Sequence, residues 1–161
     1  MIIYRVDERL IHGQVTYSWV STYQLEAIYI VDDKLRNNEF EKSSVENLGS
    51  MSMGGKKVEV FSIEEASKIL GNVEEIKGNV LVLFRNPIAV LQTLEKGGSK
   101  PDAINVANVG MAPGRKLISK SEGSTVYVTD EELATLKELN GMGVKLYQQV
   151  LATSKKKDIK L

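Results

Sequence analysis

Short runs of apolar and β-branched residues alternate with helical patterns from one end of this chain to the other. The runs expected to form strands are residues 2–6, 27–31, 58–61, 80–84, 103–106, 125–128 and 144–150. Strands that alternate with helices indicate βαβ units and a mainly parallel sheet. Right-handed crossovers then place helices on both faces. The sequence therefore predicts a single α/β domain over residues 1–161, with an open, mainly parallel sheet of about six to seven strands.

The segments between these runs carry helix signals. Helical patterns cover residues 13–22 and 37–51, and later helices are expected to begin at Ser62, Pro87 and Thr129. Ser62 is followed three residues later by Glu65, which is the spacing of a capping box. Proline is favoured at the first position of a helix, and acidic residues in the first turn, as after Thr129, suit the helix dipole.

Two segments do not fit the alternation. Residues 110–124 are expected to be rich in loops, with a short strand around Leu117. Glycines 110 and 114 resemble a phosphate loop only superficially, because the Gly-Lys-Ser/Thr ending is missing. The three lysines at 155–157 are interpreted as a solvated tail, since three adjacent lysines fall short of a basic tract.

Composition excludes several classes of function. Lysine plus arginine equal aspartate plus glutamate, 21 against 21, so no basic stripe indicates a nucleic-acid partner. The chain has no cysteine and one histidine, which argues against disulfides, thiolate nucleophiles and the usual zinc sites. We expect no metal and no cofactor. Without a signal-peptide pattern or an apolar run near the roughly 20 residues of a spanning helix, the chain is expected to be cytoplasmic and not inserted in the membrane.

The single histidine, His12, lies where the first strand is expected to end and the first helix to begin. Ligands of open α/β sheets bind beyond the carboxyl ends of the strands, which is where this junction falls. A neutral imidazole is a good nucleophile toward phosphorus. The backbone N–H groups of Gly13, Gln14 and Val15 would stabilise a phosphoryl group at the helix start, and Arg9 could bind it through two hydrogen bonds. The alternative is a histidine that caps the helix or packs at its edge.

The surrounding residues resemble a known family. The run Arg-Val-Asp-Glu-Arg-Leu-Ile-His-Gly-Gln-Val at residues 5–15 closely resembles the signature of the IIB component of the mannose/fructose/sorbose (mannose-class) sugar phosphotransferase system. Residues 104–110 and 114–121 resemble two further family motifs, so the resemblance covers essentially the whole chain. The departures from those motifs are Ala107, Val109 and Leu117.

This resemblance implies a phosphoryl relay. His12 would be phosphorylated at Nδ1 by a IIA phosphohistidine, with Arg9 supporting the phosphate. The phosphoryl group would then pass to a hydroxyl, usually the 6-OH, of a mannose-class hexose or amino sugar imported by membrane components IIC and IID. The chain would thus be a sugar phosphotransferase (EC 2.7.1.-) that associates with membrane transporter components. No metal is required at His12.

Four polar residues are candidate supports for this site. Arg5 and Asp7 share one face of the first strand by the period of two. Asp7 is expected to orient Arg9 or the imidazole, or else to form an ion pair or loop cap at the strand end. Asn105 and Asn108 end the fifth strand at the same sheet edge, where they either shape a loop through backbone hydrogen bonds or contact the phosphate.

Three basic residues, Arg115, Lys116 and Lys120, form a candidate docking loop for an acidic partner, with a merely solvated loop as the alternative. Trp19 is expected to pack in the core or an interface. Two other functions stay open for the whole chain. One is a regulatory phosphohistidine module that is not coupled to transport. The other is a small-molecule-binding α/β domain in which His12 is structural.

Overall fold

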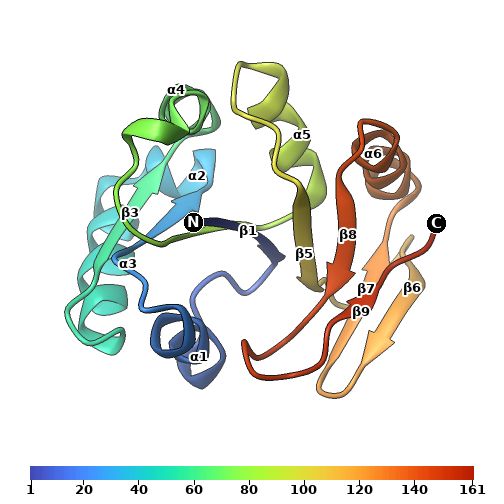
Figure 1. Cartoon of the computed structure of the whole chain (residues 1–161), viewed down its shortest axis with the longest axis horizontal. Coiled ribbons are helices and arrows are strands. Elements are labelled where there is room, and N and C mark those ends of the chain that lie inside the picture. The colour runs from blue at the N-terminus through green and yellow to red at the C-terminus, as the bar shows by residue number, and fades with distance from the viewer.

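A computed structural model describes residues 1–161 and shows one sheet flanked by helices, with a separate hairpin (Figure 1). In chain order the elements are β1 (Ile2–Asp7), α1 (Gly13–Tyr23), β2 (Ala27–Val31), α2 (Asp33–Arg36), α3 (Glu39–Ser52), β3 (Lys57–Phe61), α4 (Ile63–Gly71), the 3-10 turn η1 (Val73–Glu75), β4 (Val80–Phe84), α5 (Pro87–Glu95), β5 (Ala103–Asn108), β6 (Lys116–Ser121), β7 (Ser124–Val128), α6 (Asp130–Gly141), β8 (Lys145–Gln148) and β9 (Lys157–Asp158).

The main sheet has seven strands in the order β3-β2-β4-β1-β5-β8-β9. The first six are parallel, and β9 runs antiparallel to β8. This confirms the predicted open, mainly parallel sheet of a single α/β domain. β1 lies in the middle, between β4 and β5, so the loop that follows it leaves the centre of the carboxyl edge.

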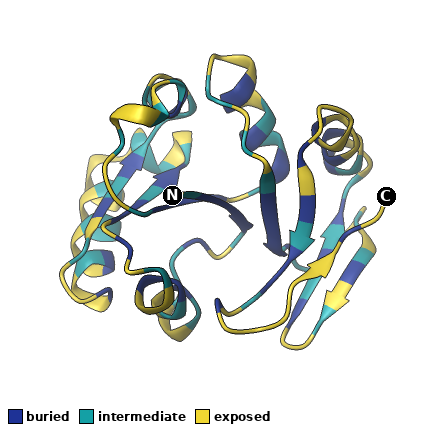
Figure 2. Ribbon diagram, in the orientation of Figure 1, coloured by how far each residue is buried: buried dark blue, intermediate teal, exposed yellow.

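Each face of the sheet carries its own apolar core. Figure 2 shows buried residues along the central strands and exposed ones on the outer sides of the helices. One core packs beneath α4, α5 and α6, and the other beneath α1 and α3. β1 serves both, because its side chains alternate between the faces. Tyr4 and Val6 enter the first core, and Ile3 enters the second. Arg5 and Asp7 continue the row of Ile3, which places two buried charges on the α1 side.

The predicted helix starts are present. The capping box between Ser62 and Glu65 begins α4, a second box at Thr129 begins α6, and Pro87 opens α5 behind an Asn86 cap. The predicted helix at 37–51 is α3, which begins after Asn38, where the Asn38 side chain accepts a hydrogen bond from the amide of Glu41. The short helix α2 precedes it and was not predicted. None of the helices is both long and apolar enough to span a bilayer.

Both strands predicted within residues 110–128 are present, but the expectation that residues 125–128 join the main sheet was wrong. The strand near Leu117 is a full six residues, β6, and it pairs with β7 as a separate antiparallel hairpin. Residues 125–128 therefore do not join the main sheet. The hairpin touches the domain where Val126 bridges to Val109, and Val126 and Val128 are buried in the core beneath α6. Alternating hydrophobicity identified the strand but does not specify its partner.

The lysines at 155–157 are exposed, as expected, but the segment is not a frayed tail. Lys157 and Asp158 form β9 against the end of β8. Ile159 follows them, is buried, and donates its backbone N–H to the carbonyl oxygen of Leu146 at 3.0 Å. One apolar residue therefore anchors a segment whose neighbours are charged.

Candidate functional site

Two residues at the junction of β1 and α1 have a left-handed backbone: Leu10 in the loop (φ 56°) and Gly13, the first residue of α1 (φ 47°). Leu10 is not a glycine, and a left-handed conformation costs such a residue about 1–2 kcal/mol. Its side chain is buried in the core beneath α1, and its N–H donates to the carbonyl oxygen of Asp7 at 2.9 Å. Burial of Leu10 thus fixes the turn that carries the chain to His12.

Asp7 is the centre of the site. Its carboxylate is fully buried and accepts four hydrogen bonds. Arg5 donates one at 3.0 Å, and Arg9 donates three: from its backbone amide at 3.1 Å, from Nε at 3.1 Å and from Nη2 at 3.2 Å. Arg9 is 39% exposed, and its Nη1 makes no hydrogen bond within the chain. The Asp7 carboxylate therefore pairs with the buried Arg5 and with Arg9, whose side chain is partly exposed to solvent.

Arg5 is held from three sides although it is only 2% exposed. Besides Asp7, it donates to the backbone oxygen of Gln149 at 2.8 Å and lies 5.3 Å from the centre of the Trp19 ring. Arg5 is in register with Asn105, which is in register with Tyr147 on β8. A polar row therefore crosses three strands beneath α1 and the loop after β8. This row supports Asp7 from inside the protein.

The His12 ring lies between Leu10 and Asp7, with 22% of the side chain exposed. Nδ1 is 3.2 Å from the carbonyl oxygen of Leu10, and a carbonyl only accepts, so the neutral ring has its proton on Nδ1 in this position. Nε2 is 3.9 Å from Oδ2 of Asp7 and is buried without a hydrogen bond. The imidazole thus turns one nitrogen toward a backbone oxygen and the other toward a buried carboxylate.

Burial lowers the pKa of His12 below its ordinary 6.5, while the charge of Asp7 opposes that shift. We expect NMR titration of the Cε1 proton to give a midpoint below 6.5, and Asp7→Asn to lower it further. Between the pKa of His12 in the folded chain and its ordinary value of 6.5 in the unfolded chain, only the unfolded chain binds the proton. Lowering the pH through that interval therefore destabilises the fold. Above pH 6.5 the ring contributes no such penalty. A midpoint at or above 6.5 would contradict the burial argument.

His12 is also the N-cap residue of α1, and no side chain caps this helix. All five other α-helices have a side-chain cap. The first amide groups of α1, at Gly13, Gln14 and Val15, therefore face outward beside the imidazole, where an anion would satisfy them. A methyl group added at Gly13 would meet no atom within 4 Å, so the space in front of this helix start is open.

The two asparagines expected near the site have different partners. Asn105 is buried and makes two hydrogen bonds with the backbone of Gln149. Its Nδ2 donates to the Gln149 carbonyl oxygen at 2.8 Å, and its Oδ1 accepts from the Gln149 amide at 3.0 Å. Asn108 accepts from the hydroxyl of Ser124 at 3.2 Å. Asn105 thus belongs to the support of Arg5, whereas Asn108 links β5 to the hairpin.

The three basic residues of the predicted docking loop do not act together. Arg115 is bound by Glu8 at 3.1 Å and by Glu132 at 3.3 Å, which brings it against the loop before His12. Lys116 lies 3.5 Å from Asp130, and Lys120 is exposed on the hairpin. Only Arg115 is therefore tied to the candidate site.

Two residues that the sequence analysis did not single out contribute to the site. Gln149 follows β8, is buried, and holds both Arg5 and Asn105. Arg85 follows β4 and donates to the backbone oxygen of Glu8 at 3.0 Å and to Asp32 at 2.8 Å. Each directly follows a strand end at the edge where His12 lies, and that position was the available signal.

No group of three or more His, Cys, Asp or Glu side chains is arranged to hold a metal ion. The arrangement instead suits a neutral nitrogen nucleophile beside anion-binding amides and an arginine.

Comparison with known proteins agrees with this chemistry. The family model "PTS system sorbose subfamily IIB component" matches residues 1–161. The sorbose-specific EIIB component of Klebsiella pneumoniae is 32% identical over 149 residues, which are 92% of this chain and 86% of that protein. The crystal structure of its IIB domain superposes with a TM-score of 0.82 at 30% identity, covering 98% of this chain and 93% of that one. The N-acetylgalactosamine-specific IIB component 1 of Escherichia coli gives a TM-score of 0.83 at 28% identity, covering 99% and 100%. The chain therefore belongs to the IIB components of mannose-class sugar phosphotransferase systems, the phosphocarrier subunits of those permeases.

Proposed function

We propose that His12 accepts a phosphoryl group from the phosphohistidine of a IIA protein and passes it to a sugar. The observation that carries this proposal is the position of the chain's single histidine, at the one α-helix start without a side-chain cap and between Asp7 and open solvent. A helix start of this kind stabilises a phosphoryl group through backbone amides and the helix dipole.

Nδ1 is the proposed nucleophile. Nε2 is buried and faces Asp7, so it is the nitrogen shielded from a protein donor. Attack by Nδ1 requires the ring to leave the Leu10 carbonyl and carry its proton on Nε2. The donor P–N bond then breaks, its electron pair stays on the donor imidazole, and the Nδ1 lone pair forms the new bond. The His12 ring becomes positively charged, and the Asp7 carboxylate stabilises that charge.

Arg9 and the first turn of α1 stabilise the transferred group. The free Nη1 of Arg9 is available to a phosphoryl oxygen while Nε and Nη2 stay on Asp7. The amides of Gly13, Gln14 and Val15 supply further donors at the helix start. Catalysis by such groups consists of alignment and charge stabilisation, as in other phosphoryl transfers.

The partners follow from the family and from this relay. As a IIB component the chain works with IIA and IIC/IID components. We propose a cytoplasmic protein that associates with the membrane components, with a mannose-class hexose or amino sugar as the final acceptor. The relatives are named for sorbose and for N-acetylgalactosamine, so the acceptor differs within the family.

The test is phosphorylation of the purified chain with labelled phosphoenolpyruvate, the general phosphotransferase proteins and a mannose-class IIA protein. We expect acid-labile label on the chain. Addition of membranes that contain the cognate IIC and IID components, with sugar, should transfer that label to the sugar. No label on this chain, while a known mannose-class IIB is labelled in the same mixture, would overturn the relay. Label that never moves to any sugar would favour the regulatory alternative.

Arg9→Lys should slow phosphoryl acceptance without unfolding the chain. Lysine keeps a positive charge beside Asp7 but lacks the planar guanidinium, which can donate to a carboxylate and to a phosphoryl oxygen at the same time. Loss of one charge-assisted hydrogen bond in the transition state corresponds to roughly a 10- to 100-fold lower rate. Because Arg9 is 39% exposed, the stability change should stay within about 1 kcal/mol. Rapid-quench labelling and thermal unfolding measure the two effects, and an unchanged rate would remove Arg9 from the phosphate site.

A further inference from the structure

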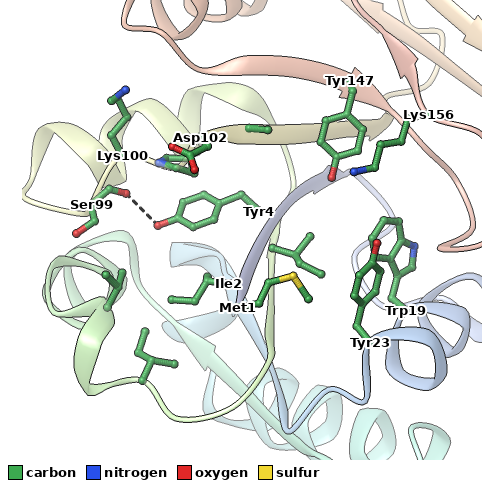
Figure 3. Close-up of a pocket in the computed structure, with 15 residues that line it drawn as sticks. Met1, Ile2, Tyr4, Trp19, Tyr23, Ser99, Lys100, Asp102, Tyr147 and Lys156 are labelled. Atoms are coloured by element: carbon green, nitrogen blue, oxygen red, sulfur yellow. Dashed lines mark hydrogen bonds between the residues drawn. The ribbon is translucent and has the colours of Figure 1, made fainter.

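A large cavity lies away from His12, near the amino ends of β1 and β5 (Figure 3). It has a volume of about 700 Å³, which falls within the usual range for small-molecule sites. Its walls come from the start of β1, the second half of α1, the turn after α4, the loop before β5, and β8 with the segment that follows it. Neither Arg9 nor His12 lines it.

Most of this cavity is apolar. Ten of the fifteen residues that line it are hydrophobic. On the α4 and α5 side of β1 it is lined by Ile2, Val73, Ile76 and the buried ring of Tyr4, whose hydroxyl donates to the backbone oxygen of Ser99 at 3.2 Å. On the α1 side it is lined by Ile3 and Trp19. Such a surface suits a flat apolar body rather than a fully hydrated ligand.

One end of the cavity is polar. Figure 3 shows the hydroxyl of Tyr147, the ammonium of Lys156 and the hydroxyl of Tyr23 turned toward the same region. The ammonium lies 4.8 Å from the centre of the Tyr147 ring, and Tyr23 is stacked on Trp19 with 5.5 Å between ring centres. Lys156 is exposed and forms no ion pair, and the hydroxyls of the half-buried Tyr23 and Tyr147 form no hydrogen bond within the chain. Three donors therefore converge without an acceptor.

The protonation of these groups favours an anion at this end. Burial raises the pKa of Tyr147 to about 12, so the phenol keeps its proton and donates. Lys156 adds a positive charge next to it. A carboxylate would accept from the ammonium and from both phenols, and charge-assisted hydrogen bonds of this kind are stronger than neutral ones.

We propose that this cavity binds a small amphipathic carboxylate, with its acid group at Tyr147, Lys156 and Tyr23. Its apolar body would lie against Met1, Ile3 and Trp19, because Ile3 and Trp19 are on the same face of the sheet as Tyr147. The site is separate from the phosphoryl transfer at His12 and does not depend on it. Trp19, the chain's single tryptophan, lines the cavity and provides an intrinsic probe of occupancy.

The experiment titrates the full chain with 3-phenylpropionate and follows both Trp19 fluorescence and heat by calorimetry. We expect saturable binding with a Kd on the order of 1 mM or tighter, and at least fivefold weaker binding of 3-phenylpropionamide, which has the same shape without the charge. Acetate, which has the charge without the body, should not bind measurably. No saturation, or equal binding of the acid and the amide, would overturn the proposal.

Variants locate the site. Lys156→Ala should weaken binding about tenfold and Tyr147→Phe about threefold, because each removes one donor. Lys155→Ala is the matched control, since Lys155 is an exposed neighbour that does not line the cavity. Equal effects of Lys155→Ala and Lys156→Ala would contradict the assignment. Binding lost in Arg9→Lys would place the carboxylate at the start of α1 instead, and would also contradict it.

Discussion

His12→Ala is expected to abolish phosphorylation of the chain by a IIA donor. The chain has no cysteine and no second histidine, so no other imidazole or thiolate can substitute as the nucleophile. The ring makes no capping hydrogen bond to α1, and its removal should leave the helix start intact. The backbone amide of His12 still donates to Thr16, at 3.1 Å in the parent structure. The measurement is acid-labile label per chain, with the near-ultraviolet signal of Trp19 as a check on folding.

A second variant tests whether the ring nitrogen of His12 is required, or only a polar side chain at this position. His12→Gln keeps a polar side chain of similar reach but has no nucleophilic ring nitrogen, and it should also remain unlabelled. Both variants should remain folded, because the ring makes a single hydrogen bond within the chain, from Nδ1 to the Leu10 carbonyl, and the loss of one such bond costs about 0.5–1.5 kcal/mol. Acid-labile label on either variant would show that the phosphoryl group resides elsewhere.

Asp7→Asn is expected to destabilise the protein by about 3–5 kcal/mol, because it leaves the guanidinium of Arg5 buried without its counter-charge. That is a large part of the total stability of a typical domain, about 5–15 kcal/mol. The melting temperature should fall by roughly 6–20 °C in a domain of this size. Asp130→Asn, whose carboxylate is 97% exposed, is the matched control and should change little.

The double variant Arg5→Met with Asp7→Asn tests the reason for this loss. If the uncompensated charge of Arg5 causes it, removing both charges should restore part of the stability that Asp7→Asn alone loses. Urea unfolding of the four proteins in the cycle gives the coupling energy. Additive losses would show that the two side chains stabilise the fold independently and would contradict a buried pair. Phosphoryl acceptance should be impaired in Asp7→Asn and in the double variant alike, because in both Arg9 and His12 lack the carboxylate.

The sheet was predictable wherever a strand is buried on both faces. Residues 27–31 and 80–84 are continuous apolar runs, and both lie inside the sheet. The hairpin of β6 and β7 was misassigned because pairing depends on contacts that local hydrophobicity does not encode. β9 was missed because it is only two residues long, and its position depends on Ile159 reaching a core built from distant parts of the chain.

The site was predictable where it is local. His12, Arg9 and the first amides of α1 lie within one short loop that had to follow the first strand. The role of Asp7 as the common partner of two arginines depends on Arg5 being buried, and Arg5 is fixed by Gln149, 144 residues along the chain. Contacts of that range arise only from the folded sheet, so Gln149 and the row through Asn105 could not be inferred from spacing.

The short last strand also limits how other proteins can dock. β9 covers β8 with Lys157 and Asp158, and at the opposite margin the carboxylate of Glu46 accepts from the amide of Val60 on β3, at 3.0 Å. Edge strands that carry charged residues, or whose backbone groups already have partners, are poor templates for pairing with a strand of another protein. We therefore expect a phosphoryl donor to meet this protein through side chains around the His12 loop, in an encounter brief enough to be repeated at every turnover.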